Sequence, residues 1–243
     1  MYSMADTGPG GKMAVRPPRR EDSAPVGGAM PRRREFLTAC VALALAVSGF
    51  PARADEFAEG AQRFIVSLAD RAVAALTVPH LPRPRRVARF RALFNDHFAV
   101  QAIAQWVLGR YWRQATAAER AEFLALFEDL MVATYVNHFA RYAGMRLSVT
   151  RTVAKGTGEA IVYTQIIGRD GKTPLPVDWR VRVDWRARTG GGQYKITDVM
   201  VKGVSISQTQ RSEFASIIRE SGGKVEGLLA ELRKRVKKVR RHA

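Results

Sequence analysis

Side chains able to bind a metal ion or attack a carbonyl carbon are few in this sequence. There is one cysteine, Cys40, and there are four histidines, His80, His97, His138 and His242. No two histidines stand at a spacing typical of metal ligands. Asp96 and His97 alone do not make a catalytic pair, and His138 falls on the apolar side of a predicted helix, where a histidine usually fills a core. We therefore expect no metal site and no cysteine or histidine catalysis.

Two glycine-containing segments come closest to known motifs. Gly203-Val204-Ser205-Ile206-Ser207 is one residue short of the G-x-S-x-G nucleophile elbow, which leaves an exported hydrolase using Ser205 as one hypothesis. Gly190 to Gly192 lacks the following helix that a dinucleotide-binding loop requires. These observations favour a binding protein with no cofactor over an enzyme.

Apolar and aromatic side chains, in contrast, are plentiful, at 47% and 9% of the chain. The segment Trp106-Val107-Leu108-Gly109-Arg110-Tyr111-Trp112 holds three large aromatic residues with no acid, histidine or cysteine among them. Tryptophan and tyrosine combine wide apolar faces with polar edges, which suits the mouth of an apolar pocket. For any single residue an ordinary core is the simpler interpretation, but the set could line a cavity.

Helical periodicity predicts the elements that would position these side chains. One apolar face runs from Phe57 to Leu76, and a second helix begins near Pro84. Thr116 and Glu119 form a capping box at the start of the longest helix. This longest helix covers residues 117–142. The other predicted helices cover residues 98–108 and 207–220, and a last one runs from Val225 into the basic residues 233–241.

The middle of the chain reads as strands. The segment from Val177 to Trp185 alternates apolar and charged residues, as a half-buried antiparallel strand does. Asp170-Gly171 and Gly190 to Gly192 are turn signals. The other predicted strands are 146–154, 159–167 and 193–201. Helices, then an antiparallel sheet, then helices indicate an α+β fold: one curved sheet of about four strands, with an apolar cavity between sheet and helices.

The N-terminus has the features of an export signal. Residues 30–54 contain three arginines, a short apolar run and a small-residue cleavage site ending at Ala54. Arg33-Arg34-Glu35-Phe36-Leu37 also resembles a twin-arginine signal. We expect a disordered extension or mis-assigned start at 1–29, a signal peptide at 30–54, a single domain at 55–236 and a basic tail at 237–243. The mature protein would be periplasmic.

The charge indicates an anionic partner. The full chain carries 40 basic and 22 acidic residues, and cleavage after Ala54 would leave 32 and 18. An exported protein rarely meets nucleic acid, so an anionic membrane is the favoured partner. The basic residues of 233–241 are the predicted site of a transient membrane contact, although a solvated tail explains them equally well.

Several segments together resemble the MlaC, or toluene-tolerance, family of periplasmic phospholipid-binding proteins. The resemblance covers about residues 57–236 and rests on 106–112, on Phe123, Phe127, Tyr135 and Tyr142, on 198–205 and on 211–214. It implies a carrier that moves phospholipid between an outer-membrane complex and an inner-membrane ABC transporter. A related branch, HpnM, is associated with hopanoids. The family usually has an Asp after Phe98, where this chain has Ala99.

The predicted lipid-binding residues are those apolar side chains that would lie between the sheet and the long helix. They are Phe94, Phe98, Ile103, Trp106, Val107, Tyr111, Phe123, Phe127, Leu130, Met131, Tyr135, Tyr142, Val149, Ile161, Tyr163, Val177, Trp179, Val181, Val183, Ile196 and Val204. Arg141 and Arg211 are weaker candidates for a lipid phosphate. The alternatives are a hopanoid carrier and a periplasmic adaptor with a filled core and no ligand.

Overall fold

The computed structural model describes residues 49–141, 144–168, 171, 174–184 and 193–242. In chain order the elements are α2 (Gly49–Leu76), α3 (Arg83–His97), α4 (Val100–Leu108), α5 (Tyr111–Gln114), α6 (Ala117–Arg141), β1 (Arg146–Ala154), β2 (Glu159–Ile167), β3 (Leu175–Asp184), β4 (Gln193–Val201), β5 (Val204–Ser205), α7 (Ile206–Glu220) and α8 (Val225–His242).

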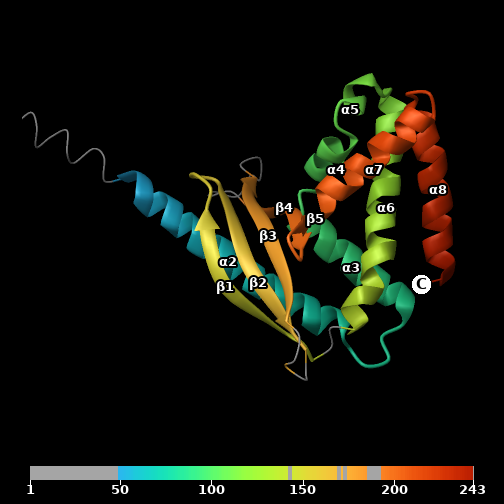
Figure 1. Ribbon diagram of the computed structural model, residues 1–243. Coiled ribbons are helices and arrows are strands. Elements are labelled where there is room, and N and C mark those ends of the chain that lie inside the picture. The colour runs from blue at the N-terminus through green and yellow to red at the C-terminus, as the bar shows by residue number, and fades with distance from the viewer. Residues whose placement is uncertain (1–48, 142–143, 169–170, 172–173, 185–192, 243) are drawn as a thin grey trace, which may run out of the picture. The chain divides into compact units, whose positions relative to one another are not determined.

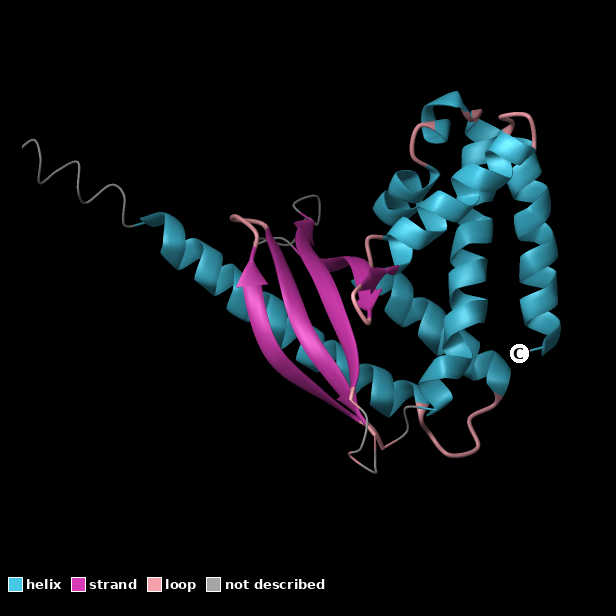
Figure 2. Ribbon diagram, viewed as in Figure 1, coloured by secondary structure: helices cyan, strands magenta, loops and turns pink. Residues whose placement is uncertain are grey.

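The strands form one antiparallel sheet whose spatial order follows the chain, β1-β2-β3-β4-β5 (Figure 2). In β2, β3 and β4, Val162, Trp179 and Val199 pair in one row across the sheet. Successive strand residues point to opposite faces, so such rows place one set of apolar side chains on the same face. Helix α2 runs along that face (Figure 1).

Two apolar cores result. The sheet core joins α2 to the strands through Ala61, Ile65, Val162, Val181 and Ile196. The helical core is built mainly from α3, α4, α6, α7 and α8, with Phe123, Phe127, Phe214, Leu228 and Leu232 among its buried members. Leu93 and Phe98, at the end of α3, pack against both cores.

The helix ends follow the local sequence. The Thr116 hydroxyl accepts a hydrogen bond from the Glu119 amide at 3.2 Å, and the Glu119 carboxylate accepts one from the Thr116 amide at 2.8 Å. This is the predicted capping box. The amide and the hydroxyl of Thr116 both donate to the Glu119 carboxylate at 2.8 Å and hold the pKa of Glu119 below its usual value. Ala99 caps α4 without a side-chain bond; its amide instead donates to the Ile196 carbonyl at 2.9 Å. This backbone hydrogen bond links the start of α4 to β4.

The predicted α+β class is confirmed, with three differences in detail. The four-residue helix α5 and the two-residue strand β5 are too short to give a periodic signal. The predicted basic tail 237–243 is instead, as far as His242, the end of α8. Asp170, Trp185 and Gly190 to Gly192 lie outside the described residues. Within the described residues no helix is both long and apolar enough to cross a membrane.

Candidate ligand-binding cavity

A cavity of about 630 Å³ lies where the two cores meet. Its volume falls in the range of about 300–1,000 Å³ typical of small-molecule sites. Members of both cores line it, including Ile65 and Leu68 of the sheet core and Phe90 and Phe127 of the helical core. The two cores therefore share a hollow that neither fills.

Helix α2 supplies one wall. Ile65, Leu68, Ala72 and Leu76 line the cavity at spacings of three and four residues, which is one face of a helix. The same face continues toward the N-terminus as Ala61, which packs in the sheet core. One apolar stripe thus serves first as core and then as cavity wall.

The sheet supplies a second wall through Val177 and Trp179 of β3. The indole nitrogen of Trp179 donates to the Thr164 hydroxyl at 3.1 Å, and that hydroxyl donates to the Val177 carbonyl. Because the polar edge of the indole is satisfied inside the sheet, the ring presents an apolar face to the cavity.

Charged groups in the wall are confined to two residues, Arg146 and Asp198. The Asp198 carboxylate accepts hydrogen bonds from the Ser205 hydroxyl at 2.6 Å, the Ser207 hydroxyl at 2.5 Å and the Val199 amide at 2.9 Å. Its charge is thus compensated at the start of α7. Burial raises the pKa of the Tyr135 phenol in the wall. Such a lining suits an apolar ligand.

The exposed members of the wall mark where the cavity reaches the surface. They are Arg146 at the start of β1, Val204 in β5 and Thr209 in α7. Val204 is 61% exposed, which is high for an apolar side chain.

The structure brings part of the predicted lipid-binding set together around the cavity. These residues come from α3, α4, α6, β3 and β5, and they are Phe94, Phe98, Ile103, Phe127, Met131, Tyr135, Val177, Trp179 and Val204.

A second group of the predicted residues packs in the two cores instead. Val107, Tyr111, Phe123 and Leu130 pack between helices in the helical core. Val149, Val181, Val183 and Ile196 pack between α2 and the strands in the sheet core. The physical reason is the length of α2, which covers the sheet face before the ligand space begins.

A third group lies away from both. Ile161 and Tyr163 alternate with Ala160 and Val162 of the sheet core and so point to the opposite face, where Arg151 lies 3.9 Å from the Tyr163 ring. Trp106 is 43% exposed. Tyr142 lies outside the described residues.

Arg211, one of the two predicted head-group arginines, is not among the residues that line the cavity. The Arg211 guanidinium lies 4.7 Å from the Trp106 ring, and its Nη1 donates to the Trp106 carbonyl at 3.2 Å. The Arg141 side chain lies outside the described residues.

The sequence interpretation missed much of the wall. It omitted the α2 residues, although their periodicity was visible, and it omitted the strand ends at Leu147, Ile166, Leu175, Val199 and Val201. It also omitted Arg146, the one cation among the described residues of the wall.

Ser205, the nucleophile of the hydrolase hypothesis, is a helix cap. Its hydroxyl donates to Asp198 and accepts from the Gln208 amide at 3.0 Å. Among the described residues, no three His, Cys, Asp or Glu side chains gather where they could hold a metal ion.

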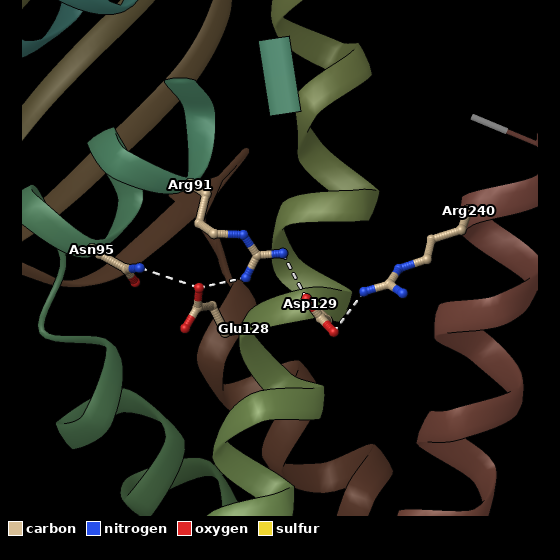
Figure 3. Close-up of polar contacts among 5 residues, drawn as sticks. All are labelled: Arg91, Asn95, Glu128, Asp129 and Arg240. Carbon is tan, nitrogen blue, oxygen red and sulfur yellow. Dashed lines mark hydrogen bonds and ion pairs between the residues drawn. The ribbon is translucent and has the colours of Figure 1, made fainter. Parts of the chain in front are cut away.

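Three of the predicted membrane-docking residues of α8, Arg233, Arg235 and Arg240, form ion pairs within the protein. Figure 3 shows Arg240 of α8 and Arg91 of α3 on the same carboxylate, Asp129 of α6, at 2.7 and 2.6 Å. Arg91 also reaches Glu128 of α6, at 2.5 Å.

Two further arginines of α8 bind carboxylates. Arg233 pairs with Glu122 at 2.6 Å and with Glu226 at 2.8 Å. Arg235 pairs with Glu231 at 2.9 Å and also contacts Glu213. The ion pairs of Arg233, Arg235 and Arg240, together with the Arg91–Asp129 pair, therefore link α3, α6, α7 and α8.

The fold and the cavity define a class of protein, an α+β module with an apolar cavity between its sheet and its helices. The chain belongs to the MlaC family, because the family model described as MlaC protein matches residues 67–234. The resemblance inferred from the sequence is thereby confirmed.

Individual relatives agree with this assignment. The chain is 23% identical over 117 residues to the intermembrane phospholipid transport system binding protein MlaC of Haemophilus influenzae, covering 48% of this chain and 53% of that protein. It is 24% identical over 117 residues to the toluene tolerance protein ttg2D of Pseudomonas putida, covering 48% of this chain and 51% of that one. The chain thus spans about half the length of these relatives.

The fold also matches a solved structure. A phospholipid-binding protein from Ralstonia solanacearum, determined in complex with a phospholipid, superimposes with a TM-score of 0.61 at 22% identity. The match covers 74% of this chain and 98% of that one. This similarity is one of fold.

Proposed function

We propose that this protein is a carrier that binds a phospholipid by its acyl chains in the cavity and moves it between membranes. The observation that carries the proposal is the cavity itself, about 630 Å³ in volume and lined by apolar side chains from both cores. Membership of the MlaC family and the phospholipid in the Ralstonia protein support it.

The energetics of lipid transfer favour an enclosed site. Each buried methylene is worth about 0.8 kcal/mol, so roughly thirty methylenes make leaving a bilayer unfavourable by on the order of 20 kcal/mol. A protein offsets this cost only by covering most of both tails. Side chains such as Phe94, Phe127 and Trp179 would provide that cover.

Carrying a lipid needs no bond to change, so the protein is proposed to be a non-enzyme. The engagement of Ser205 as a helix cap supports this over the hydrolase hypothesis. If the wild type had an esterase activity that the Ser205→Ala variant lost, the hydrolase hypothesis would be supported instead.

The surroundings of the carrier follow from the family and the sequence. The signal-like residues 30–54 support a periplasmic protein cleaved near Ala54. The transport-system name of the Haemophilus relative supports partners in an inner-membrane ABC transporter and an outer-membrane lipid complex. Anionic membrane is proposed as a transient contact.

A hopanoid is the second candidate ligand, since a flat polycycle would also suit a wall containing Phe90, Phe94 and Trp179. Native mass spectrometry of protein purified without detergent, followed by extraction, would separate the candidates. A stoichiometric diacyl phospholipid is the expected result. A hopanoid would move the protein to the HpnM branch, and an empty protein even after incubation with liposomes would favour the ligand-free adaptor.

The location of the site can be tested by filling it. Ala69 of α2 lines the cavity, whereas Ala74 of the same helix is exposed and outside it. We expect Ala69→Trp to reduce bound lipid at least about tenfold, because the indole takes the space of the tails. Ala74→Trp should retain lipid like the wild type. Equal retention by two folded variants would show that the lipid binds elsewhere.

A further inference from the structure

Among the described residues, four large apolar side chains are exposed: Val66, Val78, Trp106 and Val204. Two of these, Trp106 and Val204, belong to elements that line the cavity. Val204 is part of the exposed cavity wall, and Trp106 lies one helical turn beyond Ile103, another wall residue. Figure 1 shows α4, β5 and the start of α7 as neighbours. An exposed tryptophan therefore stands on the same helix as the wall residue Ile103, against α7.

Trp106 is held in a fixed position. The Arg211 guanidinium covers its ring at 4.7 Å and hydrogen bonds its carbonyl oxygen. Gly109, at the end of α4, has a φ of +61°, and a Cβ there would stand 3.3 Å from that guanidinium. The helix end is thus shaped to let Arg211 approach. A side chain immobilised in this way loses little conformational entropy when it contacts a partner.

The charge around Trp106 has a single sign. The chain segments that form this side, 98–118 and 199–212, contain four cations and no Asp or Glu. Lys202 is exposed in the turn between β4 and β5, and Arg110 and Arg113 are exposed beside α4. Three carboxylates flank these segments directly: Glu119 accepts a hydrogen bond from the Thr116 amide, Asp198 from Ser205 and Ser207, and Glu213 pairs with Arg235. In α8, in contrast, Arg233, Arg235 and Arg240 are paired with carboxylates.

We propose that the surface formed by Trp106, Lys202, Val204 and Arg211, here called the rim surface, docks onto an anionic lipid bilayer. Tryptophan favours the membrane–water interface, where its ring is apolar and its N–H stays wet. Each cation near an anionic surface strengthens binding by about fivefold. Contact at this place brings the cavity opening to the lipid, so the inference rests on the proposed carrier function and specifies where exchange occurs.

A bilayer fits the rim surface better than a protein partner does. The rim surface joins an apolar ring, a single valine and cations, whereas a protein interface of standard size has an apolar centre of many residues. A bilayer needs only shallow apolar insertion and positive charge.

The test measures binding to vesicles directly. Wild type, Trp106→Ala and Lys202→Asn are sedimented with vesicles of equal parts phosphatidylcholine and phosphatidylglycerol, and with vesicles of phosphatidylcholine alone. Asn suits position 202, where φ is +52°. We expect binding to the anionic vesicles to weaken about fivefold for Lys202→Asn and about tenfold for Trp106→Ala. Because neither side chain lines the cavity, lipid already bound should remain.

Matched controls are available for both changes. Val66→Ala removes an apolar group of 38% exposure from α2, and Lys224→Asn removes an exposed cation before α8; neither should alter vesicle binding. The proposal is overturned if the rim variants bind like the wild type, or if the controls weaken binding equally. It is also overturned if wild-type protein ignores both vesicles while the rim variants slow transfer to a protein complex. A wild type that docks but holds no lipid would instead refute the carrier function.

Discussion

At the scale of single residues, His97 is shaped by burial. Its side chain belongs to the few buried polar ones described, with 8% exposure, and its ring stacks on Phe64 at 5.9 Å. Nδ1 donates to the Leu93 carbonyl at 3.0 Å. Burial lowers the pKa of His97, and the hydrogen bond to Leu93 opposes this shift only in part. His97 is thus part of the packing between α3 and α2.

The lowered pKa predicts an acid-sensitive stability. Below about pH 6.5 the unfolded chain takes up a proton on this histidine more readily than the folded protein does. The stability linked to His97 is therefore complete above about pH 6.5 and is lost as the pH falls toward and through the lower folded pKa. Urea unfolding of His97→Gln should show a weaker loss of stability on acidification than the wild type.

His80 provides the control, because its side chain is exposed. His80→Gln should follow the wild-type pH dependence. If His97→Gln followed it too, the acid sensitivity would belong to other groups.

At the scale of elements, the packing of α2 on the sheet decides where core ends and cavity begins. A Cβ on Gly60 would lie 1.9 Å from the Tyr194 hydroxyl oxygen of β4. The Tyr194 ring is itself packed between Phe57 at 5.2 Å and Phe64 at 5.8 Å. Helix and strand approach this closely only because residue 60 has no side chain.

Gly60→Ala should therefore destabilise the protein. Alanine favours a helix over glycine by about 1 kcal/mol, but overpacking against a fixed ring costs about 1–3 kcal/mol. We expect a net loss of about 1 kcal/mol in the free energy of unfolding, measured by urea denaturation. Gly158→Ala, which would meet no atom within 4 Å, should change stability little. A stabilised Gly60→Ala would mean that α2 can lift from the sheet without cost.

At the scale of the whole molecule, the cavity makes stability depend on its contents. A ligand that binds only the folded state stabilises it by an amount that grows with ligand concentration over Kd. We expect extraction of bound lipid to lower the Tm, and readdition of lipid to restore it. Ala69→Trp should show no such difference, because its cavity is filled by the indole. An unchanged wild-type Tm after verified lipid removal would contradict this.

The fold was predictable because strand alternation and helical periodicity are local properties. Residues 177–184 alternate so strictly that their strand, and the antiparallel sheet around it, follow from the sequence. The cavity was only partly predictable. Val177 and Val181 lie on the same face of β3 with the same chemistry, yet Val177 lines the cavity and Val181 packs under α2. Whether an apolar residue of β3 lines the cavity or packs in the core depends on the position of α2, which is distant in the sequence. The local sequence pattern does not encode that position.

In the sequence, the strands are inserted between α6 and α7, two helices of the helical core, and this order affects how the chain folds. Helices α6 and α8 are joined by the bond from Arg233 to Glu122, which are 111 residues apart, with the entire sheet between them in the sequence. The strands themselves pair in chain order, so the hairpins can close early at little entropic cost. Once formed, they shorten the loop that α7 and α8 must cross to reach α6. We therefore expect early closure of the sheet to speed the assembly of the helical core, although the sheet contributes few side chains to that core.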